Sequence, residues 1–283
     1  MKRKKLYPCE EYDDLFEDFL NEGCRIDNRE VAGYRMKTIT SGNYRECEIY
    51  PIFTSKAVAQ RGKRKKETRK VQRLLNRKNA RKKLVRLLNT NFSEKDLWAT
   101  FTYDNEHLPK DKEAAHRYFR NYLRRLDYWM EKNGYGALKY VFVTEYIDDG
   151  RKVRIHHHLI CNFPDRDLCE AKWKGGARTY TRRLQPDDSG LEGLARYITK
   201  SRALEVKNEK MWSASHNLLQ PKVTVSDTAV TRRRMSRICL DYAEAEDFLR
   251  KRNDGYSITG EVEIKFSEFV PGAYLYAKMR LRT

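Results

Sequence analysis

The sequence predicts an α+β fold in which a central antiparallel sheet carries helices packed on it. Three observations support this class. Runs of β-branched and aromatic residues recur through the middle of the chain, helical patterns separate them, and a tight turn signal, DDGR at 148–151, joins two of the runs. Hydrophobic residues make up 40% of the 283 residues, which is enough for a packed core.

The central block of the chain gives the order of elements. Strands are expected at 96–103, 138–147, 152–161 and 177–184. Helices are expected at 113–132, 165–174 and 189–200. Ser189 is expected to cap the last helix, with Glu192 completing a capping box. The order β-α-β-β-α-β-α is typical of an antiparallel sheet of the ferredoxin-like or RRM-like class.

The flanking regions are expected to form accessory segments. An acidic amphipathic helix is expected at 10–22, a hairpin around the turn-forming SGN at 33–53, and a helix at 67–89 after the linker 54–66. A helix at 241–252 and strand-like residues at 263–279 follow the central block.

We therefore divide the chain into three regions. Residues 1–95 form an N-terminal accessory region with a hairpin and a basic helix, residues 96–203 form the core, and residues 204–283 form a C-terminal α/β extension.

The positive charge of the chain is concentrated in one segment. The formal net charge is +19, and residues 61–86 hold 14 Lys and Arg against one Glu. A block of this density repels itself and is typical of segments that bind a polyanion, although a solvated basic helix is the alternative. Nucleic acid is the expected partner, and the basic side chains expected to contact it include Lys63, Arg64, Lys65, Lys66, Arg81, Lys82 and Lys83.

Several other classes of protein are disfavoured. The chain holds no apolar run of about 18 residues, so a transmembrane helix and a membrane partner are not expected. None of the six cysteines forms a C-x-x-C pair, so a structural zinc site is not expected. The basic N-terminus has no apolar stretch after it, so we expect no secretory signal, and scattered cysteines in such a chain are expected to be reduced thiols in a cytoplasmic protein. The sequence contains no P-loop motif, so a fused ATPase is not expected.

Three consecutive histidines occur in the strand-like run KVRIHHHLI. Side chains alternate along a strand, so His156 and His158 share one face and His157 takes the other. A two-residue turn at 149–150 pairs Asp148 with Arg151, and counting back places Glu145 on the face of His156 and His158, diagonal to His156.

These three side chains offer two imidazoles and a carboxylate on one rigid surface. The alternative is a wet surface strand in which Glu145 pairs with Arg154. Mixed nitrogen and oxygen ligands with open positions suit Mg²⁺ or Mn²⁺ acting on an oxygen-rich substrate. We therefore predict a divalent metal site at Glu145, His156 and His158.

A candidate nucleophile lies in the helix expected at 189–200. Tyr197 and Lys200 are three positions apart, so they project together from this helix. A tyrosine is a weak nucleophile unless its electrophile is activated, which a metal on the scissile phosphate achieves, and Lys200 adds positive charge. An ordinary half-buried aromatic is the alternative for Tyr197.

Together these motifs resemble the HUH endonucleases, in particular the rolling-circle replication initiators of plasmids and phages. ATFTYDNEHLP at 99–109, IHHHLI at 155–160 and GLARYITK at 193–200 follow the motif order of that family. The flanking segments look more loosely like replication proteins of Gram-positive plasmids, phages and integrated elements. The resemblance covers about 96–200 and implies the HUH nuclease fold.

The resemblance also implies a mechanism. The metal held by Glu145, His156 and His158 polarises the scissile phosphate of single-stranded DNA at a replication origin. Tyr197 attacks it and becomes linked to the 5′ phosphate, which leaves a 3′-OH to prime synthesis, and Lys200 positions Tyr197 or balances charge. Host helicase and polymerase are the further partners implied.

Two positions depart from the family pattern. The residue between the metal-binding histidines is His157 rather than an aliphatic residue, and it would compete as a ligand if the strand register slipped. Gly193 stands where two-tyrosine relatives carry another tyrosine, so this chain resembles a single-tyrosine enzyme. A single-tyrosine transposase or relaxase, and a non-catalytic nucleic-acid-binding regulator on the same fold, remain the alternatives.

Other DNA contacts are expected near the motifs. Asp104 and Asn105 lie in the loop after the first strand, with a solvated loop as the alternative. Arg182 and Arg183 on the fourth strand contact phosphate or face water, and Tyr103 stacks on a base or fills the core.

Overall fold

A computed structural model describes residues 7–8, 30–54, 69–148, 151–176, 178–200, 210–266 and 271–282. The chain forms two compact units, Met1–Val71 with Pro221–Thr283, and Gln72–Gln220. The helix expected at 10–22 and residues 55–66 of the expected linker lie outside the described residues. No helix of the described ranges is long and apolar enough to cross a membrane.

The first unit is a sheet with two helices packed on it. Its strand order is β10-β12-β3-β2-β9, with β1 paired to β3 and β11 paired to β12. The strands are β1 (Tyr7–Pro8), β2 (Gly33–Ser41), β3 (Tyr44–Phe53), β9 (Lys222–Val230), β10 (Tyr256–Ile258), β11 (Glu263–Phe266) and β12 (Ala273–Leu281). Helices α7 (Arg232–Leu240) and α8 (Tyr242–Arg252) contribute Met235, Ile238 and Phe248 to its core. The N-terminal hairpin and the C-terminal extension, expected as separate regions, therefore share one sheet.

The second unit contains the predicted order β-α-β-β-α-β-α, which is confirmed. Its antiparallel sheet has the strand order β7-β4-β6-β5-β8. The strands are β4 (Leu97–Thr102), β5 (Tyr140–Asp148), β6 (Arg151–Cys161), β7 (Thr179–Arg183) and β8 (Ser213–Ala214). Each β-α-β connection leaves room for one antiparallel strand between its two strands, which is the split β-α-β arrangement of ferredoxin-like folds.

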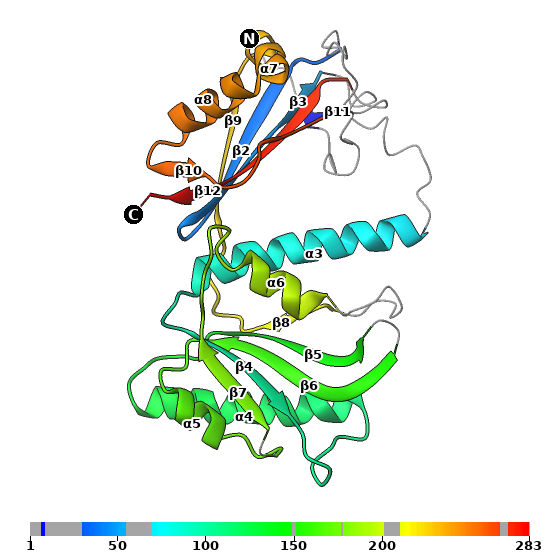
Figure 1. Ribbon diagram of the computed structural model, residues 1–283, viewed down its shortest axis with the longest axis vertical. Helices are drawn as coiled ribbons and strands as arrows, with labels where there is room; N and C mark the ends of the chain where they lie inside the picture. The colour runs from blue at the N-terminus through cyan, green and yellow to red at the C-terminus, as the bar shows by residue number, and fades with distance from the viewer. Residues whose placement is uncertain are drawn as a thin grey trace. The chain divides into compact units, whose positions relative to one another are not determined.

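Helices cover both faces of this sheet (Figure 1). They are α3 (Arg69–Asn91), α4 (Lys112–Lys132), α5 (Arg166–Ala171) and α6 (Glu192–Thr199). Helices α4 and α5 share an aromatic and aliphatic core with the face that carries Leu97, Ala99 and Phe101. The alternate residues of β4, including Trp98, face α6, whose Tyr197 ring centroid is 5.6 Å from that of Trp98. The two faces therefore differ in function: one is core and the other carries the candidate site.

The turn between β5 and β6 differs in one respect from the expected pairing. Asp148 pairs with Arg151 as predicted, but the register then shifts, and Glu145 pairs directly with His156. The predicted diagonal position of Glu145 is therefore wrong. Two more residues of β6 than of β5 lie within the irregularity, and a shift of two residues keeps each side chain on its original face. The prediction that Glu145 shares a face with both histidines is thus confirmed.

The capping box predicted for α6 is wrong. The N-cap residue is Leu191, which makes no side-chain capping bond. Ser189 instead lies in a tight turn, where its N–H donates to Asp187 Oδ1 at 2.7 Å. Asn89 Oδ1 of α3 accepts the Leu191 N–H at 3.0 Å, so another helix satisfies the start of α6. Gly190, at φ +68°, is required there because a Cβ would lie 2.2 Å from Asn89 Oδ1.

His157 points into the core, away from the other two histidines, as its place in the strand predicts. It is fully buried and stacks on Phe119, with ring centroids 4.1 Å apart. Its Nδ1 shares a hydrogen bond of 2.9 Å with Thr144 Oγ1, and its Nε2 shares one of 2.8 Å with the Tyr103 hydroxyl. Burial lowers the pKa of His157 well below its ordinary value, so the ring is neutral.

Replacing Tyr103 with Phe is expected to destabilise this unit. The change leaves the buried Nε2 of His157 without its hydroxyl partner, which costs about 1–3 kcal/mol in the free energy of unfolding. All four tryptophans, at 98, 129, 173 and 212, lie in the second unit, so tryptophan fluorescence in a urea titration reports on it. Tyr128→Phe is the matched control, because Tyr128 is 66% exposed. Equal unfolding midpoints for both variants would contradict the assignment.

Candidate active site

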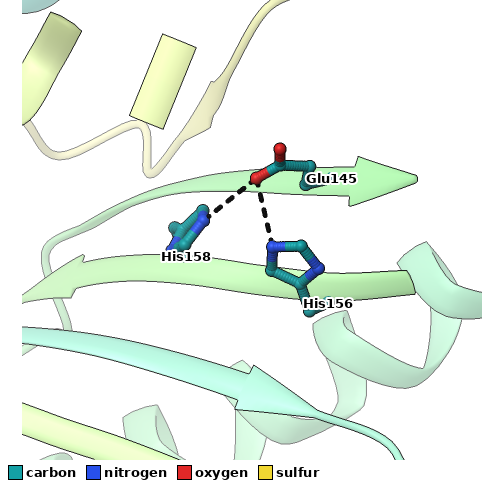
Figure 2. Close-up of side chains that lie close together, drawn as sticks. All are labelled: Glu145, His156 and His158. Carbon is teal, nitrogen blue, oxygen red and sulfur yellow. Dashed lines mark hydrogen bonds and ion pairs between the residues drawn. The ribbon is translucent and has the colours of Figure 1, made fainter. Parts of the chain in front are cut away.

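Three side chains from two neighbouring strands converge on one point above the sheet (Figure 2). Oε2 of Glu145 on β5 lies 3.1 Å from Nε2 of His156 and 3.2 Å from Nε2 of His158, both on β6. The ligand atoms of the three residues all lie within 4.8 Å of one another. Two ligands about 2.1 Å from one ion and at right angles to each other are about 3.0 Å apart, so these separations fit a shared divalent ion.

The hydrogen bonds behind the histidines direct their Nε2 atoms toward this point. Nδ1 of His156 lies 2.9 Å from the carbonyl oxygen of Arg154, which can only accept, so Nδ1 carries the proton. Nδ1 of His158 lies 3.1 Å from Thr100 Oγ1, which can accept in the same way. With a proton on Nδ1, Nε2 of each ring points at the Glu145 carboxylate, either as a lone pair that a shared cation would bind or, where the ring carries a second proton, as an N–H that donates to Oε2. An outer hydrogen-bond partner on Nδ1 is typical of metal-binding histidines.

Tyr197 lies beside this cluster on helix α6. Its side chain is 46% exposed, and its ring centroid is 5.7 Å from that of His158. The ammonium nitrogen of Lys200 lies 5.0 Å from the centre of the Tyr197 ring. The fold therefore brings the predicted nucleophile, its lysine and the predicted metal ligands together on one face of the sheet.

Arg81 on α3 holds the C-terminal end of α6. Its Nε donates to Thr199 Oγ1 at 3.0 Å, and its Nη2 donates to the Thr199 carbonyl at 3.4 Å. Burial is the main cause that lowers the pKa of Arg81, and the positive charges of the nearby Arg77 and Arg196 lower it further. The guanidinium of Arg81 therefore holds the helix that carries Tyr197, and its contact with DNA stays a prediction.

The other predicted basic contacts are spread over different environments. Lys83 is exposed and lines a pocket of about 660 Å³ together with Arg77, Arg120 and Trp212. Lys82, the next residue toward the N-terminus, is half-buried. Lys63, Arg64, Lys65 and Lys66 lie outside the described residues. Contact of these basic side chains with DNA stays a prediction.

Arg182 and Arg183 are exposed and alternate along β7. The Arg182 guanidinium carbon lies 4.1 Å from the centre of the Trp98 ring, on the face of Tyr197. Arg183 donates to the Pro164 carbonyl at 2.8 Å and to the Lys95 carbonyl. Arg182 is therefore the one of the pair that stands next to the candidate site.

The loop after β4 is tied to the strand that carries the histidines. Asn105 Oδ1 accepts from Arg154 Nη2 at 2.9 Å, and the Tyr103 carbonyl accepts from Arg154 Nε at 3.0 Å. The hydrogen bond from the His107 ring lowers the pKa of Asp104. The side chain of Tyr103 is 1% exposed, so it fills the core and does not stack on a base.

Sequence reasoning missed Trp98, Thr100 and Tyr180. Thr100 on β4 pairs with His158 on one side and with Tyr180 on the other, so His158, Thr100 and Tyr180 form a row across the sheet. Alternation within 96–103 predicts that Trp98 and Thr100 share a face. The pairing of β4 with β6 and β7 joins strands far apart in the sequence, and no turn signal reveals it.

Comparison with known proteins agrees with this geometry. Residues 96–202 match the model of a family described as replication-associated protein ORF2. The matched segment contains the three converging ligands together with Tyr197 and Lys200. No curated protein and no solved structure matched the chain. The match covers less than half of the 283 residues, so it shows that this segment is similar to the family.

Replacing Thr100 with Val is expected to weaken metal binding. The change removes the oxygen that orients the His158 ring, and loss of such an outer partner typically lowers metal affinity about 10–100-fold. Titration calorimetry with MnCl₂ measures the affinity directly. Thr102→Val is the matched control, because Thr102 lies on the same strand and face, opposite His156, but among the described residues its hydroxyl makes no hydrogen bond to either histidine. Equal Mn²⁺ affinities of wild type and Thr100→Val would refute the role given to Thr100.

Proposed function

We propose that this protein is a metal-dependent single-stranded DNA endonuclease and strand-transfer enzyme. It nicks a replication origin through a 5′-phosphotyrosine at Tyr197 and thereby initiates rolling-circle replication. The observation that carries the proposal is the contact between the ring of Tyr197 and His158, one of three convergent metal ligands. The family match over 96–202 supports a replication role for the same segment.

The three ligands fit a divalent cation such as Mg²⁺ or Mn²⁺. Such an ion, when bound by Glu145, His156 and His158, neutralises charge on the scissile phosphate and makes its phosphorus more electrophilic. The strands β5 and β6 hold the ligands on a paired, rigid surface, and the carbonyl of Arg154 and the hydroxyl of Thr100 fix the two rings. Little reorganisation is then needed when the substrate arrives.

The reaction is an exchange of phosphodiester bonds. The phenolic oxygen of Tyr197 loses its proton and attacks the phosphorus, and the bond from phosphorus to the 3′ oxygen of the preceding nucleotide breaks. That oxygen takes up a proton and becomes a free 3′-OH. The bond energy is kept in the phosphotyrosine, so the reverse reaction rejoins the strand without ATP.

Lys200 assists the nucleophile in this scheme. Its ammonium group lies 5.0 Å from the centre of the Tyr197 ring and offsets the negative charge that gathers on the phosphate in the transition state. The exposure of Tyr197 leaves this side of the ring open to a DNA strand.

Helix α6 offers one tyrosine, Tyr197, to this site. Gly193 lies one helical turn before Tyr197, where a second tyrosine would share its face. A Cβ at Gly193 would have Asp187 Oδ2, at 3.4 Å, as its nearest neighbour outside the helix backbone. Packing therefore does not require a glycine at this position. Because the residue there is nevertheless not a tyrosine, we propose a single-tyrosine enzyme. A helicase and a polymerase of the host would then open the duplex and extend the 3′-OH.

Wild-type protein with Mn²⁺ is expected to cut single-stranded DNA and to become covalently linked to it. The substrate is a single-stranded library with a randomised stretch, and the products are separated on a denaturing gel while the protein is weighed by mass spectrometry. Tyr197→Phe is expected to bind DNA but to form no adduct, because it lacks the attacking oxygen. EDTA is expected to abolish cutting by the wild type.

Tyr180→Phe is the control for this experiment. Tyr180 is another exposed tyrosine on the same face of the sheet, and its hydroxyl has no place in the chemistry. It is expected to cut and to form the adduct. Binding without cutting by the wild type in Mg²⁺ and in Mn²⁺ would instead identify a nucleic-acid-binding regulator. An adduct that persists in Tyr197→Phe would assign the nucleophile elsewhere.

Lys200→Met is expected to slow cutting more than it weakens DNA binding. Removal of a single charge-stabilising group typically lowers the rate about 10²–10³-fold. Single-turnover cutting of a labelled oligonucleotide gives the rate, and fluorescence anisotropy gives the affinity. Lys200→Arg keeps the charge and is expected to recover part of the rate. A loss of affinity as large as the loss of rate would show that Lys200 only helps to bind the strand.

A further inference from the structure

A pocket of about 340 Å³ lies beside Tyr197, between strand β7 and helix α6. Its lining combines aromatic, aliphatic and polar side chains, including Trp98, Arg182, Gln185, Asp187, Gly193 and Tyr197. The volume is at the lower end of the range of roughly 300–1,000 Å³ that is usual for small-molecule sites. The mechanism proposed above leaves this pocket without a role.

We propose that the pocket binds a nucleobase of the DNA strand, in the nucleotide next to the phosphate that Tyr197 attacks. The base in the pocket then selects the sequence at which the strand is cut. This inference rests on the proposed function, because it takes single-stranded DNA as the ligand.

The aromatic wall of the pocket is suited to the flat face of a base. The guanidinium carbon of Arg182 lies 4.1 Å from the centre of the Trp98 ring, and the Trp98 and Tyr197 rings meet edge to face at 5.6 Å. Unpaired bases are bound by proteins through stacking on aromatic rings and on arginine planes. The Arg182 guanidinium could also pair with a phosphate, but the faces of Trp98 and Tyr197 offer stacking that only a base can use, so the aromatic wall favours a base.

The polar lining indicates which bases fit. Asp187 is exposed at the pocket and uses Oδ1 to hold the Ser189 N–H at 2.7 Å. A carboxylate repels a phosphate but accepts hydrogen bonds from the exocyclic amino group of cytosine, adenine or guanine. Thymine has no such group, and its N3–H donor lies between two carbonyl oxygens that a carboxylate repels. Gln185 is exposed beside it and supplies both a donor and an acceptor. The pocket therefore favours an amino-bearing base over thymine.

The place of the pocket fixes where this base lies along the strand. Tyr197 contributes to the pocket wall and also lies against the metal ligand His158. When a phosphate of the strand lies at the metal ligands, the base of the adjacent nucleotide therefore lies at the pocket. The exposed ring of Tyr180, 57% accessible and 6.5 Å from the Trp98 centroid, adds a second stacking surface beside it.

Gly193 gives a way to fill the pocket without changing its aromatic wall. Its missing side chain leaves room that only Asp187 Oδ2 borders at 3.4 Å outside the helix backbone. Gly193→Leu therefore places an isobutyl group where the base is expected. Asp187→Asn is the second variant, because it keeps Oδ1 for the turn and replaces the other carboxylate oxygen with a donor.

The first arm of the test sequences the cut sites. Wild-type protein with Mn²⁺ is incubated with a single-stranded library carrying a randomised stretch, and covalently attached fragments are recovered under SDS and sequenced. Thymine is expected to be depleted about 10-fold at one position next to the nick, the loss that one or two hydrogen bonds to a base edge would cause. Gly193→Leu is expected to lose the depletion of thymine at this position and to keep any base preference at other positions. Asp187→Asn is expected to cut strands that carry thymine at this position. Ala171→Leu, which adds bulk to an exposed position on α5, is expected to behave as the wild type.

The second arm measures binding without cutting. Tyr197→Phe in EDTA is titrated against an oligonucleotide that is selected from the library by its binding to this variant, and against copies of that oligonucleotide with an abasic site at each position in turn. Loss of the base is expected to weaken binding about 10-fold when the pocket is open and not at all in Tyr197→Phe/Gly193→Leu.

The two arms separate the two proposals. Cutting with no selected base next to the nick, or with a bias that both pocket variants retain, overturns the pocket and leaves the nicking proposal intact. Absence of cutting by the wild type, together with an abasic penalty that Gly193→Leu removes, overturns the nicking proposal and supports the pocket. Absence of both cutting and an abasic penalty overturns both.

Discussion

The buried imidazole of His157 fixes the register on which the candidate site depends. It is held between the hydroxyls of Thr144 and Tyr103 and stacks on Phe119, so both ring nitrogens and a ring face have partners in the core. A slip of β6 by one residue would turn His157 outward and send His156 and His158 into an apolar layer. Burying two imidazoles without partners is costly, so the inward hydrogen bonds of one histidine hold its two neighbours on the outer face.

The same strand connects the first motif to the metal ligands. The side chain of Arg154 is bound to Asn105 and to the carbonyl of Tyr103, while its own carbonyl accepts the proton of His156 Nδ1. One residue, Arg154, therefore makes hydrogen bonds both to the loop after β4 and to the ring of the candidate metal ligand His156. This gives the polar loop of the first motif a structural role next to the histidines, whether or not its side chains touch DNA.

Local rules predicted much of the site but not its long-range contacts. Strand alternation and the two-residue turn placed Glu145, His156 and His158 on one face, because a shift of register by two residues does not alter the face. The irregularity that sets Glu145 directly opposite His156 has no signal in the turn. The capping box at Ser189 failed because Asn89, about a hundred residues earlier, satisfies the start of α6. Tyr103 was ambiguous because a tyrosine between apolar residues suits both a core and a base-stacking surface, and only the position of its partner, His157, decides.

The basic segment shows how one composition serves two purposes. Its charge alone predicts contact with a polyanion, yet Arg81 is committed to Thr199 at the end of α6 and Lys83 faces solvent at a pocket. The helix α3 therefore positions α6 from both ends, through Arg81 and through Asn89. Since Tyr197 and Lys200 lie on or at the end of α6, their placement over the β5–β6 surface depends on α3. Charge density along a sequence cannot distinguish an arginine that orients the helix carrying Tyr197 from a lysine that is exposed to solvent. The difference depends on which helix packs beside each residue.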